Sequence, residues 1–322
     1  MTLEEILKGV SRSFYLSLRF LPRSIRPTMS LAFLACKAPD TIADTKLVPL
    51  NERLDWLNRY RELFETPQPK NLLGLEDALG EKQADPYERG LLSQLEGLLE
   101  ALQKLPSADW ALIRSLVSEL TQGMKIDLTR FPGETEKELQ SFQTEKELEQ
   151  YTYYVAGCVG RFWTKVLREH FGFAKKWNQG EQEKLGENFG KGLQRVNILR
   201  DLPRDLRRGR CYLPNEQLKN VGVTPKELLY PNTLLRVRPY FRECIKVSRQ
   251  YLHCGEKYAQ GFPGYAVRQK WVVLTPMNLG FQTLQLLEHS NDWLKPEVVH
   301  KVGRVQVYET MFSSIAAALR MW

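Results

Sequence analysis

The sequence predicts an all-α protein that folds as a single domain over residues 1–322. Apolar residues recur at helical spacing through most of the chain, most clearly in residues 51–64 and 87–105. Strand signals are scarce, because no six-residue stretch alternates β-branched residues between turn residues. Prolines stand between the periodic segments and mark their ends. Together these observations predict a bundle of helices joined by loops.

The remaining elements follow in chain order. An apolar run at Met29–Cys36 predicts an early buried helix. Gly133–Gln150 carries six glutamates and two lysines, and we expect a solvated connection and helix entry there rather than a linker between domains. Trp271–Leu287 is an uncharged run of 17 residues that contains Pro276 and Asn278. These polar and helix-breaking residues favour a buried helix over a membrane span.

The composition narrows the class of protein. Hydrophobic residues make up 43% and charged residues 26% of the 322 residues, which excludes disordered and fibrous classes. Lys and Arg number 46 against 38 Asp and Glu, a net charge of +8. A positive excess suits an anionic partner, which could be a phosphorylated small molecule, a membrane surface or a nucleic acid.

The cysteines and the first residues indicate the compartment. The five cysteines are odd in number and widely spaced, with no C-x-x-C pair, so neither a disulfide framework nor a zinc site is expected. This usage is typical of a reducing, cytoplasmic location. The first residues are acidic where a signal peptide is basic, and we expect no secretion signal.

Two D-x-x-x-D motifs are candidates for chemistry. One is Asp40–Asp44 and the other is Asp201–Asp205, and each ends a largely apolar stretch. The i, i+4 spacing places both carboxylates of a pair on one face of a helix. A single such pair is most simply a solvated face. Two pairs that converge from two helices suit a hard cation, and Mg²⁺ typically takes one or two carboxylates together with phosphate oxygens.

Arginines crowd around the second motif. Arg200, Arg204, Arg207, Arg208 and Arg210 lie within a few residues of its two aspartates. Arginine is the preferred bidentate donor to phosphate. Carboxylates that could bind a metal therefore alternate here with guanidinium groups that could bind a phosphate. A surface network of ion pairs is the alternative interpretation.

Several motifs together resemble those of squalene and phytoene synthases. The resemblance covers roughly residues 10–290 and is specific, because separate motifs agree in type and order. It implies an isoprenoid-synthase helical bundle with a central cavity. The matching segments are Ser11–Phe14, Asp40–Asp44, Gly123–Leu128, Tyr151–Gly160, Gln194–Asp205 and Tyr212–Pro214.

The C-terminal part favours the squalene synthase branch. Lys301–Met311 is similar to the Lys/Arg-rich segment before the last helix of squalene synthases, where the resemblance implies contacts with NADPH phosphate. Leu274–Asn278, with Pro276, resembles their proline-containing core helix, and phytoene-type enzymes usually lack this match. The membrane anchor of eukaryotic squalene synthases has no counterpart here, so the chain looks like a bacterial form.

The chain also departs from the family pattern. Lys37 stands where Arg is common, and a lysine holds phosphate as a point charge without the fork of an arginine. Ala43 replaces an acidic residue of the eukaryotic first motif, which leaves that motif two carboxylates. Pro39 and Pro203 each remove a helical hydrogen bond and are expected to kink their helices beside the metal ligands.

The resemblance implies a role for each matching residue. Tyr154 is expected near the reacting carbons and is catalytic with Asp40 and Asp201, although periodicity alone could not choose it over Tyr151 or Tyr153. The implied Mg²⁺ ligands are Asp40, Asp44, Asp127, Asn197, Asp201 and Asp205. The implied substrate-binding residues are Ser11, Arg12, Ser13, Phe14, Lys37, Gln194 and Arg200, and the NADPH contacts are Arg12, Lys37, Arg200, Lys301 and Arg304.

The expected function is a Mg²⁺-dependent prenyl transferase, a squalene synthase. It joins two molecules of farnesyl diphosphate head to head through presqualene diphosphate, and NADPH reduces the product to squalene. The nearest alternative stops at dehydrosqualene, phytoene or presqualene diphosphate. An alternative from another class is a non-catalytic, basic helical protein docked on an anionic membrane. We expect no nucleic acid partner, no transmembrane segment and at most a peripheral contact with the inner face of a membrane.

Overall fold

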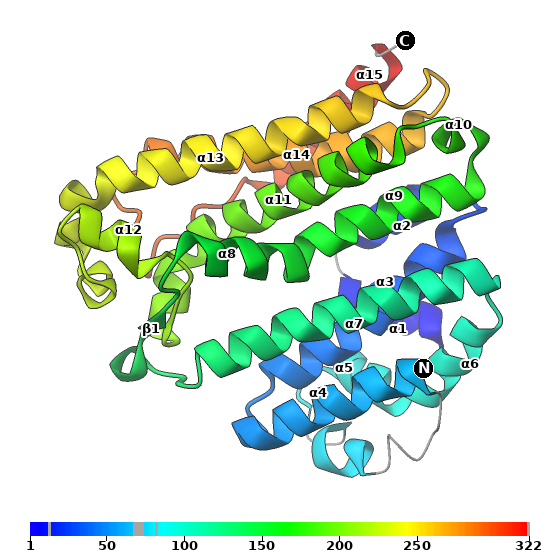
Figure 1. Cartoon of the computed structure of the whole chain (residues 1–322), viewed down its shortest axis with the longest axis horizontal. Coiled ribbons are helices and arrows are strands. Elements are labelled where there is room, and N and C mark those ends of the chain that lie inside the picture. The colour runs from blue at the N-terminus through cyan, green and yellow to red at the C-terminus, as the bar shows by residue number, and fades with distance from the viewer. Residues whose placement is uncertain (12–13, 67–73, 81–82, 321–322) are drawn as a thin grey trace. The chain divides into compact units, whose positions relative to one another are not determined.

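A computed structural model describes residues 1–11, 14–66, 74–80 and 83–320 of the chain (Figure 1). Helices dominate it, as predicted, and the all-α fold class is confirmed. The chain forms two compact units. Unit 1 comprises Met1–Leu128 and Phe162–Lys175, and unit 2 comprises Thr129–Arg161 and Lys176–Trp322. A single domain over residues 1–322 stays a prediction.

Unit 1 is built from helices of the N-terminal part of the chain. They are α1 (Leu3–Ser11), α2 (Phe14–Phe20), α3 (Arg26–Asp44), α4 (Leu50–Glu65), the π-helical turn η2 (Glu76–Gly80), α5 (Pro86–Ser93), α6 (Leu95–Gln103), α7 (Ser107–Arg130), most of α9 (Cys158–His170) and α10 (Gly172–Lys175). Helix α3 packs against α4, α5 and α6. It runs without interruption through Pro39.

A buried polar cluster joins three helices of unit 1. The carboxylate of Asp109 on α7 accepts a hydrogen bond of 2.6 Å from the Thr28 hydroxyl on α3 and lies 2.9 Å from Nε2 of His170 on α9. Asp109 is buried, so its partners satisfy a group that would be costly to bury alone. The cluster holds α3 in place, and α3 carries the first aspartate motif.

Unit 2 contains the longest helices. They are α8 (Glu145–Thr152), the π-helix η4 (Tyr153–Gly157), the first turn of α9, α11 (Gln179–Arg207), α12 (Asn215–Asn220), α13 (Leu234–Gln260), α14 (Val267–Glu288) and α15 (Arg304–Arg320), with the short 3₁₀ turns η3 (Glu136–Glu138), η5 (Pro225–Leu229) and η6 (Pro231–Thr233).

Helix α11 is the centre of unit 2. It packs against α13, α14 and η4, and α14 in turn packs against α15 (Figure 1). Glycine allows the backbones of α9 and α11 to pack closely at Gly160. Any other residue there would place its Cβ 1.9 Å from the carbonyl oxygen of Gly186, which is too close for a contact. Indole hydrogen bonds tie neighbouring elements, since Trp293 donates to the Leu199 carbonyl at 2.9 Å and Trp271 to the Met311 carbonyl at 2.8 Å.

The polar segment 133–150 is more structured than a solvated connection. Thr144 caps α8 by accepting the backbone N–H of Glu147, as expected for a helix entry. Phe142, however, is buried, and the two-residue strand β1 (Gln140–Ser141) pairs in parallel with β2 (Arg210–Cys211). The sequence does not predict this ladder, because two residues on each side carry no alternation pattern and the partners are far apart in the chain.

The uncharged run 271–287 lies within α14, as predicted, and the helix continues through Pro276. Within the described ranges, no helix combines the length and apolarity that crossing a bilayer requires. Helix α11 likewise continues through Pro203.

Candidate active site

The first aspartate motif occupies the C-terminal end of α3 in unit 1. Asp40 is partly exposed, and Asp44, the last residue of the helix, is exposed. Lys37 donates to Oδ2 of Asp40 at 2.8 Å and lies 3.0 Å from Oε1 of Glu88 on α5. Burial lowers the pKa of the Lys37 ammonium, but its ion pairs with Asp40 and Glu88 outweigh this and raise the pKa above its ordinary 10.5. A positive charge is therefore held beside the motif.

The other predicted residues of unit 1 are spread over three helices. Ser11 is buried at the end of α1, where its hydroxyl donates to the Leu7 carbonyl at 2.5 Å. Arg12 and Ser13 lie outside the described residues, and Phe14 begins α2. Asp127 is buried in the last turns of α7.

The second motif lies on a single polar stripe of α11 in unit 2. Gln194, Asn197, Asp201 and Asp205 follow one another at spacings of three or four residues, and all four are partly exposed. The intervening face of the helix, from Arg195 to Leu206, is mostly buried. The amide of Asn197 donates to Oε1 of Gln194 at 3.4 Å. Local helical geometry therefore brings one amide and two carboxylates of the predicted ligand set onto one accessible line.

Two arginines hold Asp201. The guanidinium of Arg200 donates to both carboxylate oxygens, Nε to Oδ1 at 3.0 Å and Nη2 to Oδ2 at 2.6 Å. Arg204 reaches Oδ2 at 3.3 Å and also lies 3.8 Å from Asp205. Guanidinium and carboxylate groups therefore alternate along this part of α11, as the sequence predicts.

The three candidate tyrosines lie in different environments. Tyr151 is buried and stacks on Tyr212, with ring centroids 5.0 Å apart, in an aromatic cluster with Phe142. Tyr153 and Tyr154 open the π-helix η4 and are partly exposed, and their rings meet edge to face at 5.2 Å. A core aromatic cannot readily contact a substrate, so this contrast favours the later pair as candidates.

The predicted NADPH contacts Lys301 and Arg304 lie at the entry to the last helix. Both are exposed, and Arg304 is the first residue of α15. Val302 between them is buried and anchors the segment.

The donor set is of the kind a hard dication prefers, because every predicted ligand offers a carboxylate or amide oxygen. The stripe on α11 is accessible. Asp201 pairs with the guanidinium groups of Arg200 and Arg204, and a diphosphate could bind these groups in its place. These features fit Mg²⁺.

Among the described residues, no group of three or more His, Cys, Asp or Glu side chains gathers as metal ligands. The two aspartate motifs belong to different units, so each is described on its own.

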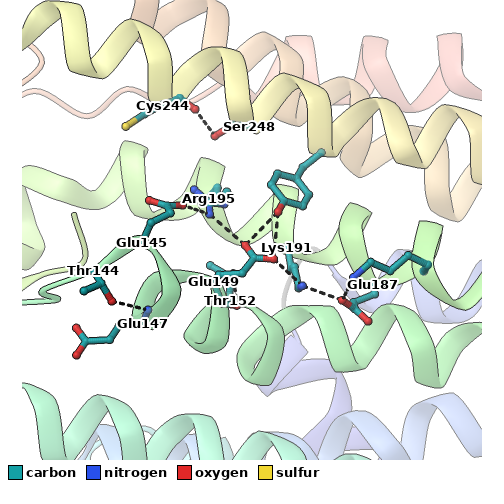
Figure 2. Close-up of polar contacts among 12 residues, drawn as sticks. Thr144, Glu145, Glu147, Glu149, Thr152, Glu187, Lys191, Arg195, Cys244 and Ser248 are labelled. Carbon is teal, nitrogen blue, oxygen red and sulfur yellow. Dashed lines mark hydrogen bonds and ion pairs between the residues drawn. The ribbon is translucent and has the colours of Figure 1, made fainter. Parts of the chain in front are cut away.

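The sequence does not predict a network of charges beside η4, in which Glu187, Lys191 and Arg195 are buried and Glu149 is partly exposed. Lys191 and Arg195 on α11 pair with Glu149 on α8, and Lys191 also pairs with Glu187 (Figure 2). Burial raises the pKa of the Glu149 carboxyl, but hydrogen bonds from Lys191 and Arg195 outweigh it and leave the pKa below its ordinary 4.5. The i, i+4 spacing of Glu187, Lys191 and Arg195 is the one signal that could have pointed to it.

Comparisons with known proteins match this fold and these motifs. The chain is 28% identical to the squalene synthase ERG9 of Saccharomyces cerevisiae over 229 residues, 70% of this chain and 48% of that protein. It is 26% identical to the chloroplastic phytoene synthase of Daucus carota over 296 residues, 90% of this chain and 63% of the relative. The chain thus spans about half to two thirds of the length of these relatives.

A solved structure shares the fold. TcSQS, in complex with the ligand E5700, superposes with a TM-score of 0.79 at 19% identity, over 99% of this chain and 87% of the other. A family model described as squalene/phytoene synthase matches residues 7–307. The match includes every motif of the candidate site, and the chain belongs to the squalene/phytoene synthase family.

Proposed function

We propose that the chain is a squalene synthase that joins two molecules of farnesyl diphosphate. The observation that carries the proposal is the polar stripe of α11, where Asn197, Asp201 and Asp205 share one accessible line with Arg200 alongside. Carboxylates for a metal and a guanidinium for a phosphate are what the binding of a metal diphosphate needs. Family membership supports the same substrate class.

The side chains divide the work of binding. Asp201 and Asp205, with Asn197, would hold Mg²⁺ on α11 of unit 2. Asp40, Asp44 and Asp127 are the Mg²⁺ ligands proposed within unit 1. When bound, the dication neutralises the diphosphate and makes it a leaving group. Arg200 then exchanges Asp201 for phosphate oxygens. Lys37 stays protonated and offers a point charge to a second diphosphate.

In the first half-reaction, one allylic C–O bond breaks and diphosphate leaves with the bonding electrons. The double bond of the second molecule attacks the allylic cation, and loss of a proton closes the cyclopropane of presqualene diphosphate. The ring face of Tyr154 stabilises the cation, and its phenol oxygen relays the proton. In the second half-reaction, the remaining diphosphate leaves and the skeleton rearranges to a cation. NADPH, when bound, would supply the hydride that reduces this cation to squalene. Lys301, Arg304 and Arg200 would contact the NADPH phosphate from unit 2. Arg12 and Lys37 are the NADPH contacts proposed within unit 1.

A product assay tests the proposal. The purified chain is incubated with farnesyl diphosphate and Mg²⁺, with and without NADPH, and the lipids are identified by mass spectrometry. Squalene that forms only with NADPH supports the assignment. Equal yields of the final product without NADPH refute it in favour of the dehydrosqualene or phytoene type, which the relationship to phytoene synthases keeps as the second candidate.

Helix α15 supports a peripheral contact with an anionic lipid surface at the cytoplasmic face of a membrane. Its exposed side carries Val305, Tyr308, Phe312 and Leu319 at spacings of three, four and seven residues, all at least 48% exposed. Its other side packs on α14 through hydrogen bonds such as that from Gln282 to Thr310 at 2.8 Å. The helix begins and ends with an arginine, although the exposed Glu309 also lies beside the stripe. Exposed apolar side chains on a helix with arginines at both ends suit an anionic lipid interface.

A further inference from the structure

Lys191 is a buried cation at the middle of α11. Its side chain is 5% exposed, and its ammonium lies 2.7 Å from an oxygen of Glu149 and 2.7 Å from an oxygen of Glu187 (Figure 2). Glu149 belongs to α8 and Glu187 to the preceding turn of α11. An ammonium is costly to bury, so the fold tolerates Lys191 only where both carboxylates meet it.

The stem of Lys191 lies against the π-helix η4. A Cβ on Gly157, the last residue of η4, would lie 3.2 Å from side-chain carbons of both Glu187 and Lys191. One residue earlier on α11, a Cβ on Gly190 would lie 2.3 Å from the carbonyl oxygen of Ala156. A Cβ would therefore be tightly crowded at Gly157 and would clash at Gly190, which shows that α11 and the C-terminal half of η4 pack closely. Gly190 and Lys191 lie on the surface of α11 that η4 contacts.

The N-terminal side of η4 is held through Glu149. This carboxylate, one turn before η4, accepts hydrogen bonds from Lys191 at 2.7 Å, from Arg195 at 3.2 Å and from the Tyr251 hydroxyl on α13 at 3.1 Å. Lys191 therefore joins both ends of the π-helix, through Glu149 before it and through the Gly157 contact at its end.

This support matters because a π-helix does not hold its shape by itself. It is rare, is usually a single turn inserted in an α-helix, and is common at functional sites. Here η4 follows α8 directly and leads directly into α9. The Lys191 ammonium also lies 5.6 Å from the centroid of the Tyr153 ring, which in turn meets the Tyr154 ring edge to face. A continuous set of contacts thus runs from Lys191 through Tyr153 to Tyr154.

We propose that Lys191 is a positioning residue that, by bridging Glu149 and Glu187 across η4 and packing on Tyr153, sets the orientation of the Tyr154 ring for its work on the cation. The inference rests on the proposed function, in which Tyr154 contacts the reacting carbons. Lys191 itself touches no substrate. Its loss acts on the chemical step more than on substrate binding, because the orientation of a ring matters most where charge develops.

Lys184 provides the matched control. It also pairs with Glu187 at 2.7 Å, but its side chain is 61% exposed. The three variants to compare are Lys191→Met, Lys191→Arg and Lys184→Met. We expect Lys191→Met to lower kcat about tenfold or more with KM for farnesyl diphosphate changed less than about twofold. Lys191→Arg restores most of kcat, and Lys184→Met matches the wild type.

A spectroscopic readout separates positioning from general stability. Fluorotyrosine-labelled protein without substrate is observed by ¹⁹F NMR, with the signals of Tyr153 and Tyr154 assigned by Tyr→Phe variants. Lys191→Met shifts and broadens both signals, whereas Lys184→Met leaves them unchanged. If Lys191→Met does not fold, the double variant with Glu187→Gln, which also removes one of the two carboxylates that faced the ammonium, takes its place.

The outcomes are decisive in either direction. Unchanged tyrosine signals in Lys191→Met, or a raised KM with wild-type kcat, overturn the positioning role. A wild-type protein that makes no product from farnesyl diphosphate refutes the proposed function instead. In that case the NMR comparison still decides whether Lys191 sets the two rings.

Discussion

The guanidinium of Arg200 holds both carboxylate oxygens of its chain neighbour Asp201, at 3.0 and 2.6 Å. Adjacent residues on a helix point in different directions, so this fork forms only because the long arginine side chain turns back over the aspartate. The same fork geometry fits a phosphate. The pair therefore neutralises Asp201, a predicted metal ligand, with a group that is also suited to binding phosphate.

Asp201→Asn removes a predicted metal ligand. We expect at least about a hundredfold loss of turnover with farnesyl diphosphate, because the amide is a weaker ligand for a hard dication. Thermal unfolding changes by less than about 1 kcal/mol, since the lost ion pairs with Arg200 and Arg204 are partly exposed. Asp55→Asn, which breaks an ion pair with Arg59 on α4, is the control and keeps full activity. Near-normal activity of Asp201→Asn at saturating Mg²⁺ removes the metal-site assignment.

Tyr154→Phe tests the proposed catalytic phenol. The ring face remains, so the loss is confined to the hydroxyl, and kcat falls about 10²-fold or more with little change in KM. Steady-state kinetics with farnesyl diphosphate measure both constants. Tyr151→Phe, in the buried aromatic cluster, keeps its kcat. The reverse result would assign the role to Tyr151.

Lys301→Ala and Arg304→Ala test the NADPH contacts. Loss of a charged contact to phosphate costs about 1.5–3 kcal/mol, which is roughly a 10- to 150-fold loss of cofactor affinity. Presqualene diphosphate should accumulate at limiting NADPH while its formation continues, and the effect should fade at high NADPH. Arg320→Ala, at the other end of α15, leaves the product ratio unchanged. Wild-type squalene formation by both variants at limiting NADPH contradicts the assignment.

The network around Lys191 predicts how stability depends on pH. The pKa values of Glu149 and Glu187 are lowered below 4.5, so their contribution is complete above that value and is lost as pH falls through the folded-state pKa. The pKa of Lys191 is raised above 10.5, so its contribution disappears only as pH rises past that value.

Urea unfolding between about pH 6 and about pH 3 measures this dependence. The charged groups that face Glu149 are Lys191 and Arg195 from α11, and the Tyr251 hydroxyl faces it from α13. In the Lys191→Met variant, Glu149 keeps only Arg195 and the Tyr251 hydroxyl as partners. The free energy of unfolding of this variant should therefore fall less steeply with decreasing pH than that of the wild type. Equal slopes for the two proteins would show that Lys191 does not depress these pKa values.

Phe312→Glu tests the membrane contact of α15. A charge in the centre of the apolar stripe opposes burial in lipid, and binding to vesicles that contain an anionic lipid should drop at least about tenfold. Flotation of the chain with such vesicles measures the bound fraction. Leu235→Glu, at an exposed apolar position on α13, is the control and binds like the wild type. A wild type that floats equally with neutral vesicles, or not at all, contradicts the anionic surface.

The sequence by itself determined the helical class and the place of each aspartate motif on a helix. Both follow from local periodicity: Asp40 and Asp44 close α3, and Asn197, Asp201 and Asp205 share a face of α11, because the α-helix repeats every three to four residues wherever it forms. Both helices continue through Pro39 and Pro203, and a kink at either proline stays a prediction.

Only the tertiary structure decided which side chains between the motifs are buried and what they meet. Tyr151 is buried and Tyr153 is partly exposed, although they stand two residues apart. Residues two apart on a helix point to roughly opposite sides, and only the packing of neighbouring elements decides which side faces the core. Glu149 belongs to a segment whose composition predicts exposure to solvent. In the structure it accepts hydrogen bonds from Lys191 and Arg195, which lie about forty residues further along the chain. Long-range pairing leaves no local pattern, since its free energy comes from partners that meet only when α8, α11 and α13 pack together.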